Sequence, residues 1–235
     1  MDSEAIGSNN YNSSITDFEE VVRLDTEYIP QLKRFPMDTL IFISYEAATS
    51  LIPVLAILII LYLKDHRKTD HLHFSSYVLM LEFAVYLVGV YHFTGSGTLY
   101  DSLRYGLLIS NVNLIPFSNY IFVPAYLLNI LLFMPFGILV PLCFKKLDSF
   151  PFIFFSGAAF STFIELTQLL NTRATDVDDL IMNTLGAVSG YVLIKLIMKM
   201  LSPKERKDDV APVMFVLIMV SAFAGRFLLY RGQVL

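Results

Sequence analysis

Charged residues are scarce in this sequence. Asp, Glu, Lys and Arg make up 16% of the 235 residues, whereas a water-soluble domain usually has about a quarter. Hydrophobic residues make up 55%, and the mean hydropathy is +0.60. This composition excludes an ordinary soluble domain and predicts an integral membrane protein. We therefore expect the lipid bilayer as its first partner and expect no nucleic acid.

Cysteine is nearly absent, because Cys143 is the only one. A single thiol forms no disulfide within the chain and has no metal-ligand companion, so we expect it to pack as an apolar side chain. The first residues also lack the basic and apolar regions of a cleaved secretory signal. No nucleophile elbow, zinc spacing or phosphate loop is found. We expect no cofactor, and whether the protein is an enzyme stays open.

The hydrophobic runs predict an all-α fold, a polytopic membrane bundle of about six transmembrane helices. About twenty apolar residues cross a hydrocarbon core of about 30 Å, and six stretches are long enough. They are residues 40–63, 74–93, 121–144, 150–170, 180–200 and 211–230. Pro53 should bend the first helix. Glu82 lies near the middle of the second, and we expect it to face the interior of the bundle.

Basic residues orient the bundle, because Lys and Arg gather on the cytoplasmic side of membrane proteins. Most of the loop Lys and Arg lie in the connections 64–73, 145–146 and 204–207, whereas the opposite connections hold only Arg104 and Arg173. This pattern places the N-terminal tail, the loops 94–120 and 171–179 and the C-terminus outside. Residues 15–35 of the tail are either disordered or form an interfacial helix.

Three predicted spans carry side chains that lipid would reject, all in the outer half of the membrane. Asn129 lies in the third span, and helical spacing aligns small and polar residues along one side of the fourth and fifth. These stripes are Gly157, Ser161, Thr162, Glu165 and Gln168, and Asp179, Asn183, Gly186 and Gly190. The last two residues form a G-x-x-x-G pair, which lets helices approach closely. We expect the two stripes to face each other.

This polar cluster has two interpretations. An ionisable group inside a membrane is costly unless it is used, and carboxylates and amides suit hydrogen bonding to sugars, amides or a lipid head group. Alternatively, the cluster only holds helices together, with Glu165 paired to Arg173 or Arg226 and Asn183 capping its own helix. The acidic run 175–179 is typical of a cation-binding loop and of a helix start. We favour the helix start and predict no metal site.

Five short motifs resemble those of one family. They are NLIPF at 113–117, NILLFMPFG at 129–137, STFIELTQ at 161–168, RATDVDDLIMNTLG at 173–186 and GY at 190–191. Their order and their positions in the spans resemble the VanZ-like membrane proteins. The resemblance implies a VanZ-like domain over residues 74–231. It leaves residues 1–39 as an extracytoplasmic acidic tail and residues 40–73 as an additional first helix followed by a basic cytoplasmic loop.

VanZ-like proteins are bacterial membrane proteins associated with low-level resistance to teicoplanin and related lipoglycopeptides. The resemblance therefore implies a multi-pass protein of the bacterial cell membrane. By motif it marks Asn113, Pro116, Asn129, Pro135, Gly137, Glu165, Gln168, Asp176, Asp179, Asn183 and Gly186. With Arg173 and Asp178 added from the acidic loop, the candidate ligand-binding residues are Asn113, Asn129, Glu165, Gln168, Arg173, Asp176, Asp178, Asp179 and Asn183.

Three functional hypotheses follow from the resemblance and the polar cluster. In the first, an outward-facing site binds the lipoglycopeptide antibiotic or its target, a lipid-linked peptidoglycan precursor. In the second, the protein is an enzyme or transporter that acts on a lipid-linked cell-wall component, with Glu165 or Asp179 as general acid or base. In the third, it is a structural partner of another wall-synthesis protein.

Overall fold

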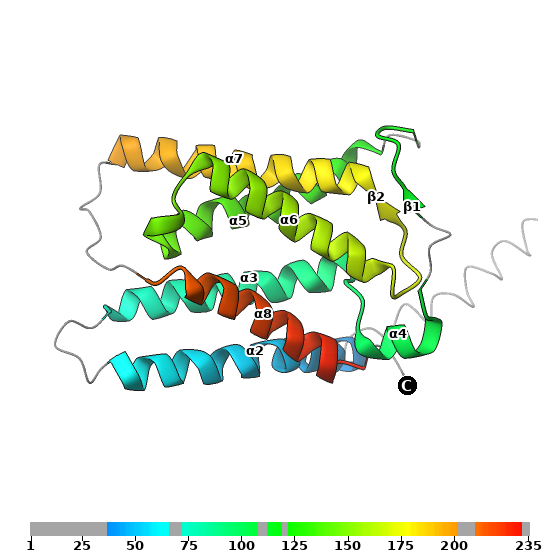
Figure 1. Ribbon diagram of the computed structural model, residues 1–235, viewed down its shortest axis with the longest axis horizontal. Helices are drawn as coiled ribbons and strands as arrows, with labels where there is room; N and C mark the ends of the chain where they lie inside the picture. Colours follow the sequence, from blue (N-terminus) through cyan, green and yellow to red (C-terminus); the bar gives the residue numbers. More distant parts are fainter. Residues whose placement is uncertain (1–36, 66–71, 108–111, 119–121, 202–209, 232–235) are drawn as a thin grey trace, which may run out of the picture. The chain divides into compact units, whose positions relative to one another are not determined.

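Helices make up nearly all of the structure, a computed structural model that describes residues 37–65, 72–107, 112–118, 122–201 and 210–231 (Figure 1). The chain divides into two units, Met1–Ser44 and Tyr45–Leu235. Of the first unit, only the beginning of one helix is described. The helices are α2 (Met37–Asp65), α3 (Phe74–Thr94), α4 (Leu99–Tyr105), α5 (Val123–Cys143), α6 (Phe150–Gln168), α7 (Val177–Leu201) and α8 (Val213–Leu229).

Five of these helices, α2, α3, α5, α6 and α7, are long and apolar enough to cross a membrane. The sixth apolar helix, α8, has 17 residues and is shorter than the other five. The prediction of an all-α membrane bundle is confirmed. The sequence did not predict α4, which begins with a capping box: the Thr98 hydroxyl accepts from the Asp101 backbone N–H, and the Asp101 carboxylate accepts from the Thr98 N–H.

Two very short strands add a feature that the apolar pattern did not predict. Strand β1 (Val112–Asn113) precedes α5, and strand β2 (Thr175–Asp176) precedes α7. They pair in parallel, with Asn113 opposite Asp176. The pair therefore lies where α5 and α7 begin and where α3 and α6 end (Figure 1). We call this the strand end of the bundle.

Helices α5 and α7 approach each other closely through glycine. A Cβ atom on Gly186 or Gly190 of α7 would collide with a backbone carbonyl of α5, that of Ile130 or Met134. A Cβ on Gly137 of α5 would likewise collide with the backbone of α7. The G-x-x-x-G pair therefore packs against α5. The expectation that the whole stripe of α7 faces α6 is wrong for Gly186 and Gly190. These two residues face α5, where only glycine fits the close approach of the helices.

Two other sequence expectations are also wrong. Glu82 is exposed on α3, because the buried side of that helix is occupied by Met80, Phe83 and Leu87, and Glu82 lies about 100° from Phe83 around the helix. Thr162 is exposed on α6, and its hydroxyl donates to the Ala158 carbonyl of its own helix. The expected tail helix at 15–35 and most of the basic loop at 64–73 lie outside the described residues.

A buried ion pair joins α2 to α8. Glu46 and Arg226 are 3% and 4% exposed, and Arg226 Nε donates to Glu46 Oε1 at 2.7 Å. The guanidinium also donates to the carbonyl and hydroxyl oxygens of Ser96, beyond the end of α3. The second carboxylate oxygen of Glu46 lies 2.7 Å from His92 Nδ1. Both carboxylate oxygens of Glu46 and the Nε and Nη1 atoms of Arg226 therefore have partners.

Replacing Gly190 by alanine should destabilise the bundle. The new methyl group would meet the Met134 carbonyl of the neighbouring backbone, which cannot rotate aside. We expect the free energy of unfolding to fall by about 1–3 kcal/mol or more, measured by helical circular dichroism during denaturation in mixed micelles. Gly89→Ala on α3 is the control, because that Cβ would have no atom from a neighbouring helix within 4 Å. Equal stability of the two variants would contradict the close approach.

Removing Arg226 alone should lower the free energy of unfolding more than removing both charges of the ion pair. Arg226→Met leaves the Glu46 carboxylate buried without its cation, which typically costs about 3–5 kcal/mol. Adding Glu46→Gln removes that charge, so we expect the double variant to recover most of the loss. The same denaturation assay tests this expectation, and a double variant less stable than Arg226→Met would contradict it.

Candidate functional site

Polar side chains from three helices converge at the strand end of the bundle. The close packing of α5 and α7 brings Asn129 Nδ2 to within 2.6 Å of Asp179 Oδ1, to which it donates. Asn183, one turn further along α7, donates through Nδ2 to the Ser161 hydroxyl of α6 at 2.9 Å. The predicted contact between the stripes of α6 and α7 is thus present at Asn183 and Ser161.

The end of α6 is tied to its neighbours by polar side chains. Glu165 Oε2 accepts the backbone N–H of Asp176 in β2 at 3.0 Å. Gln168 Nε2 donates to the carbonyl of Thr94, the last residue of α3, at 2.8 Å. The chain leaves α3 through Gly95, whose φ of +62° is unfavourable for residues with a Cβ. These bonds fix the carboxyl and amide groups relative to α3.

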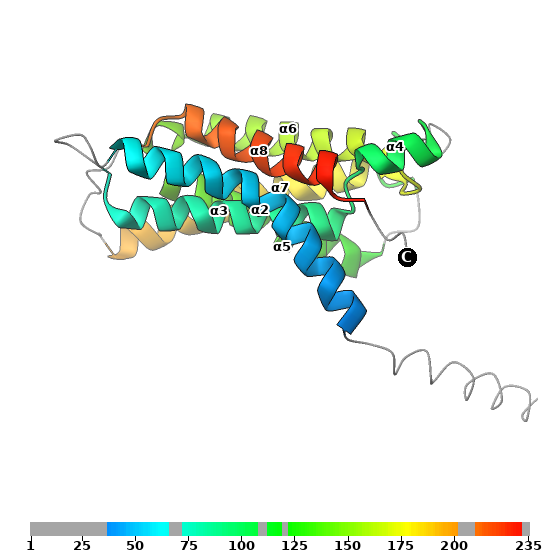
Figure 2. The same cartoon turned by 90° about the horizontal axis from the view of Figure 1, so that it is seen from below.

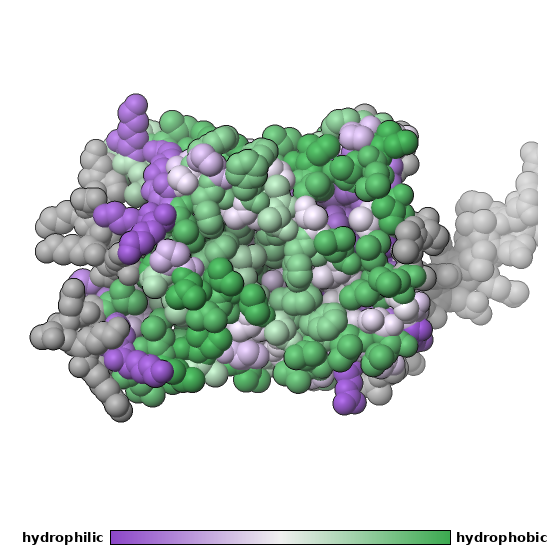
Figure 3. Space-filling view, viewed as in Figure 1, coloured by the Kyte–Doolittle hydropathy of each residue, from purple (hydrophilic) through white to green (hydrophobic). Residues whose placement is uncertain are grey.

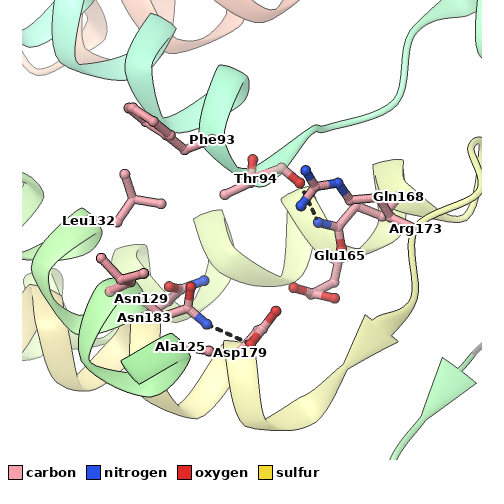
Figure 4. Close-up of a pocket in the computed structure, with 11 residues that line it drawn as sticks. Phe93, Thr94, Ala125, Asn129, Leu132, Glu165, Gln168, Arg173, Asp179 and Asn183 are labelled. Atoms are coloured by element: carbon pink, nitrogen blue, oxygen red, sulfur yellow. Dashed lines mark hydrogen bonds between the residues drawn. The ribbon is translucent and has the colours of Figure 1, made fainter. Parts of the chain in front are cut away.

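A pocket of about 440 Å³ lies among these helices (Figure 4). Its volume falls within the usual range for small-molecule sites. Six of the nine candidate ligand-binding residues line it: Asn129, Glu165, Gln168, Arg173, Asp179 and Asn183. The other lining residues, which the sequence reasoning missed, are Phe93, Thr94, Ala125, Leu128 and Leu132. The spacing of three and four residues among Ala125, Leu128, Asn129 and Leu132 was the signal for a shared face on α5.

The pocket has one polar and one apolar side. Figure 4 shows Phe93 and Leu132 across the cavity from Glu165. Phe93 on α3 is 68% exposed and Leu128 on α5 is 65% exposed. Because both residues line the pocket and also lie on the outer surface of their helices, the pocket opens on the side of the bundle, between α3 and α5.

Several polar groups in the pocket have no partner among the described residues. The side chains of Gln168 and Asn183 are buried, yet Gln168 Oε1 and Asn183 Oδ1 accept no hydrogen bond there. Arg173 is exposed and forms no ion pair within the described part of the chain. The predicted alternative pairing of Glu165 is absent in this part too, because Arg226 binds Glu46. The pocket therefore offers two unpartnered buried acceptors and one exposed cation.

The remaining three candidates lie outside the pocket and hold a loop in place. Asn113 Nδ2 donates to the Asp176 carboxylate at 3.2 Å. Asp178 is 2% exposed and accepts from the Phe117 backbone N–H at 2.9 Å and the Tyr126 hydroxyl at 2.5 Å. Phe117 has a φ of +56°, which is uncommon for a residue with a Cβ. These three polar residues therefore fix the NLIPF loop.

The acidic run begins a helix, as the favoured interpretation expected. Asp176 Oδ1 accepts the backbone N–H of Asp178 at 2.9 Å in the first turn of α7. Asn183 lies in the second turn and binds Ser161 rather than capping α7. Within the described ranges, no group of three His, Cys, Asp or Glu side chains is arranged to hold a metal ion.

The fold and the pocket define a helical membrane protein with a polar cavity that opens on the side of the bundle. The model of the VanZ/LLP1 family matches residues 51–198. The chain belongs to the VanZ-like family. The match begins within α2 and ends within α7, so it includes every helix that lines the pocket. No curated protein and no solved structure matches the chain.

Removing the Asp178 carboxylate should release the NLIPF loop. Asp178→Ala deletes both acceptors, so the Phe117 amide loses its partner, and we expect its hydrogen exchange to accelerate by about tenfold or more. Hydrogen–deuterium exchange read on peptides covering residues 112–118 measures this. Tyr126→Phe is the matched control, because it removes one donor and leaves the Phe117 bond. Equal protection in all three proteins would contradict the assignment.

Proposed function

We propose that the protein contributes to resistance to teicoplanin-type lipoglycopeptides by binding an amphiphile in the pocket between α3, α5, α6 and α7. The ligand is the antibiotic or its lipid-linked cell-wall target. The observation that carries the proposal is the pair of buried, unpartnered acceptors, Gln168 Oε1 and Asn183 Oδ1. A buried polar group without a partner is costly, and a ligand that donates to it removes the cost.

The shape of the pocket supports an amphiphilic ligand. Its polar side carries carboxylate, amide and guanidinium groups, which suit sugars and amides. Its exposed Phe93 and Leu128 suit an acyl chain that remains in the bilayer. At about 440 Å³ the pocket holds only part of a lipoglycopeptide or lipid-linked precursor, and the rest of the molecule lies outside it.

The orientation of the bundle is part of the proposal. The strand end faces outside, because the positively charged connections lie at the opposite end of the helices. A lipoglycopeptide acts outside the cell and inserts its chain in the outer leaflet, the half of the membrane where the pocket then lies. Binding there withdraws the drug from its target, or shields the target from the drug, in the bacterial cell membrane.

Two substitutions test the proposal in cells. Glu165→Gln removes a carboxylate that lines the pocket, and Asn183→Ala removes one unpartnered acceptor. We expect both to lose protection against teicoplanin, measured as the minimal inhibitory concentration, while the protein still accumulates in the membrane. Thr162→Ala is the control, because Thr162 is exposed on the same helix as Glu165 and does not line the pocket.

Binding to purified protein separates the proposed mechanisms. We expect nanodiscs with the wild-type protein to bind teicoplanin in preference to vancomycin, which has no acyl chain, and Glu165→Ala to bind much less. Full protection by both pocket variants would leave the polar cluster with a structural role only. Product formed from a labelled lipid-linked precursor in liposomes would instead favour an enzyme or transporter.

A further inference from the structure

The polar lining groups of the pocket lie at successive depths from the strand end inward. Arg173 precedes α7 in the loop, Gln168 ends α6, and Asp179 lies in the first turn of α7. Asn183 lies four residues further along α7, about 6 Å deeper at 1.5 Å per residue, and Leu132 follows on α5. Inward from Arg173 the polar groups thus form a band of acceptors, the middle band, and the apolar side runs alongside this band from Phe93 near the end of α3 to Leu132 on α5.

The direction of the buried amides makes the middle band an acceptor surface. The Gln168 side chain is 4% exposed, and its Nε2 must face the Thr94 carbonyl, which only accepts, so its Oε1 is left for the pocket. Asn183 is 2% exposed and uses Nδ2 on Ser161, so its Oδ1 is also unpartnered. The carboxylates of Glu165 and Asp179 add further acceptor oxygens.

We propose that the pocket selects an amphiphile whose hydroxyl or amide N–H groups lie directly next to its acyl chain, as in an N-acylated amino sugar, and that this chain lies between α3 and α5 in the outer leaflet. Gln168, Asn183 and Glu165 accept from those groups. Any anionic group of the ligand lies farther out, at Arg173. This inference rests on the proposed function and specifies the chemical class of its ligand.

The same geometry disfavours a lipid in which phosphate adjoins the chain. With the chain between Phe93 and Leu128, such a phosphate lies in the middle band. It would leave the amide oxygens of Gln168 and Asn183 without donors. Of the two ligands in the proposed function, the pocket therefore favours an acylated sugar over a precursor whose chain is joined through phosphate.

The absence of tryptophan from the sequence allows a direct test. Leu128→Trp places a single fluorescent reporter on the wall of the pocket. Leu131→Trp places one on the exposed surface of the same helix, at 58% exposure and outside the pocket. The full-length proteins are prepared in nanodiscs of neutral lipid and titrated with N-dodecanoyl glucosamine or dodecyl phosphate, which have chains of equal length.

We expect N-dodecanoyl glucosamine to change the emission of Leu128→Trp saturably, with a dissociation constant at least about tenfold below that of dodecyl phosphate. Leu131→Trp should show no saturable change. Adding Asn183→Leu to Leu128→Trp should weaken the binding of N-dodecanoyl glucosamine by about tenfold. It should change the binding of dodecyl phosphate little. Leu132→Trp serves as a second pocket reporter if Leu128→Trp does not accumulate.

Each other outcome overturns a stated part of the inference. Equal or tighter binding of dodecyl phosphate, or no saturable response to either probe, overturns the assigned head-group chemistry. An equal response at Leu131→Trp overturns the path of the chain between α3 and α5. The proposed function fails on a different measurement, full teicoplanin protection by Glu165→Gln and Asn183→Ala, so the two failures are distinguishable.

Discussion

The close approach of α5 and α7 is the constraint on which the rest of the structure depends. Backbone carbonyls of one helix occupy the space where a Cβ of the other would lie at Gly137, Gly186 and Gly190. Because glycine lets the two helix axes come this close, Asn129 and Asp179 lie at hydrogen-bonding distance near the strand end. The packing that stabilises the bundle therefore also fixes one wall of the pocket.

Neighbouring acidic residues have different partners because a helix turns by about 100° per residue. Asp178 points toward the NLIPF loop and Tyr126, whereas Asp179, one position later, points into the pocket toward Asn129. Asp176, before the helix, binds Asn113 and the start of α7. Two carboxylates of the run are thus used to hold the strand end together, and only Asp179 is left beside the cavity.

The sequence predicted what local pattern and hydrophobicity determine, and missed what depends on packing between distant helices. The membrane spans follow from periodicity. So do the start of a helix in the acidic run and the contact of Asn183 with the fourth predicted span. The exposure of Glu82 does not follow from periodicity, because its neighbours on α3 compete for the buried side of the helix. Nor does the contribution of Phe93, since the end of α3 is brought beside α6 by bonds between residues far apart in the sequence, such as that from Gln168 to Thr94 and that from Gly97 to Thr167.

Two buried polar clusters in this protein differ in how completely their polar groups are paired. Around Arg226, the carboxylate oxygens of Glu46 and the oxygens of Ser96 all have partners. Around Asn183 and Gln168, equally buried amides keep an unpartnered oxygen beside a cavity. In a low-dielectric setting an unpartnered acceptor is costly. This difference supports the proposal that the open cluster receives hydrogen-bond donors from another molecule.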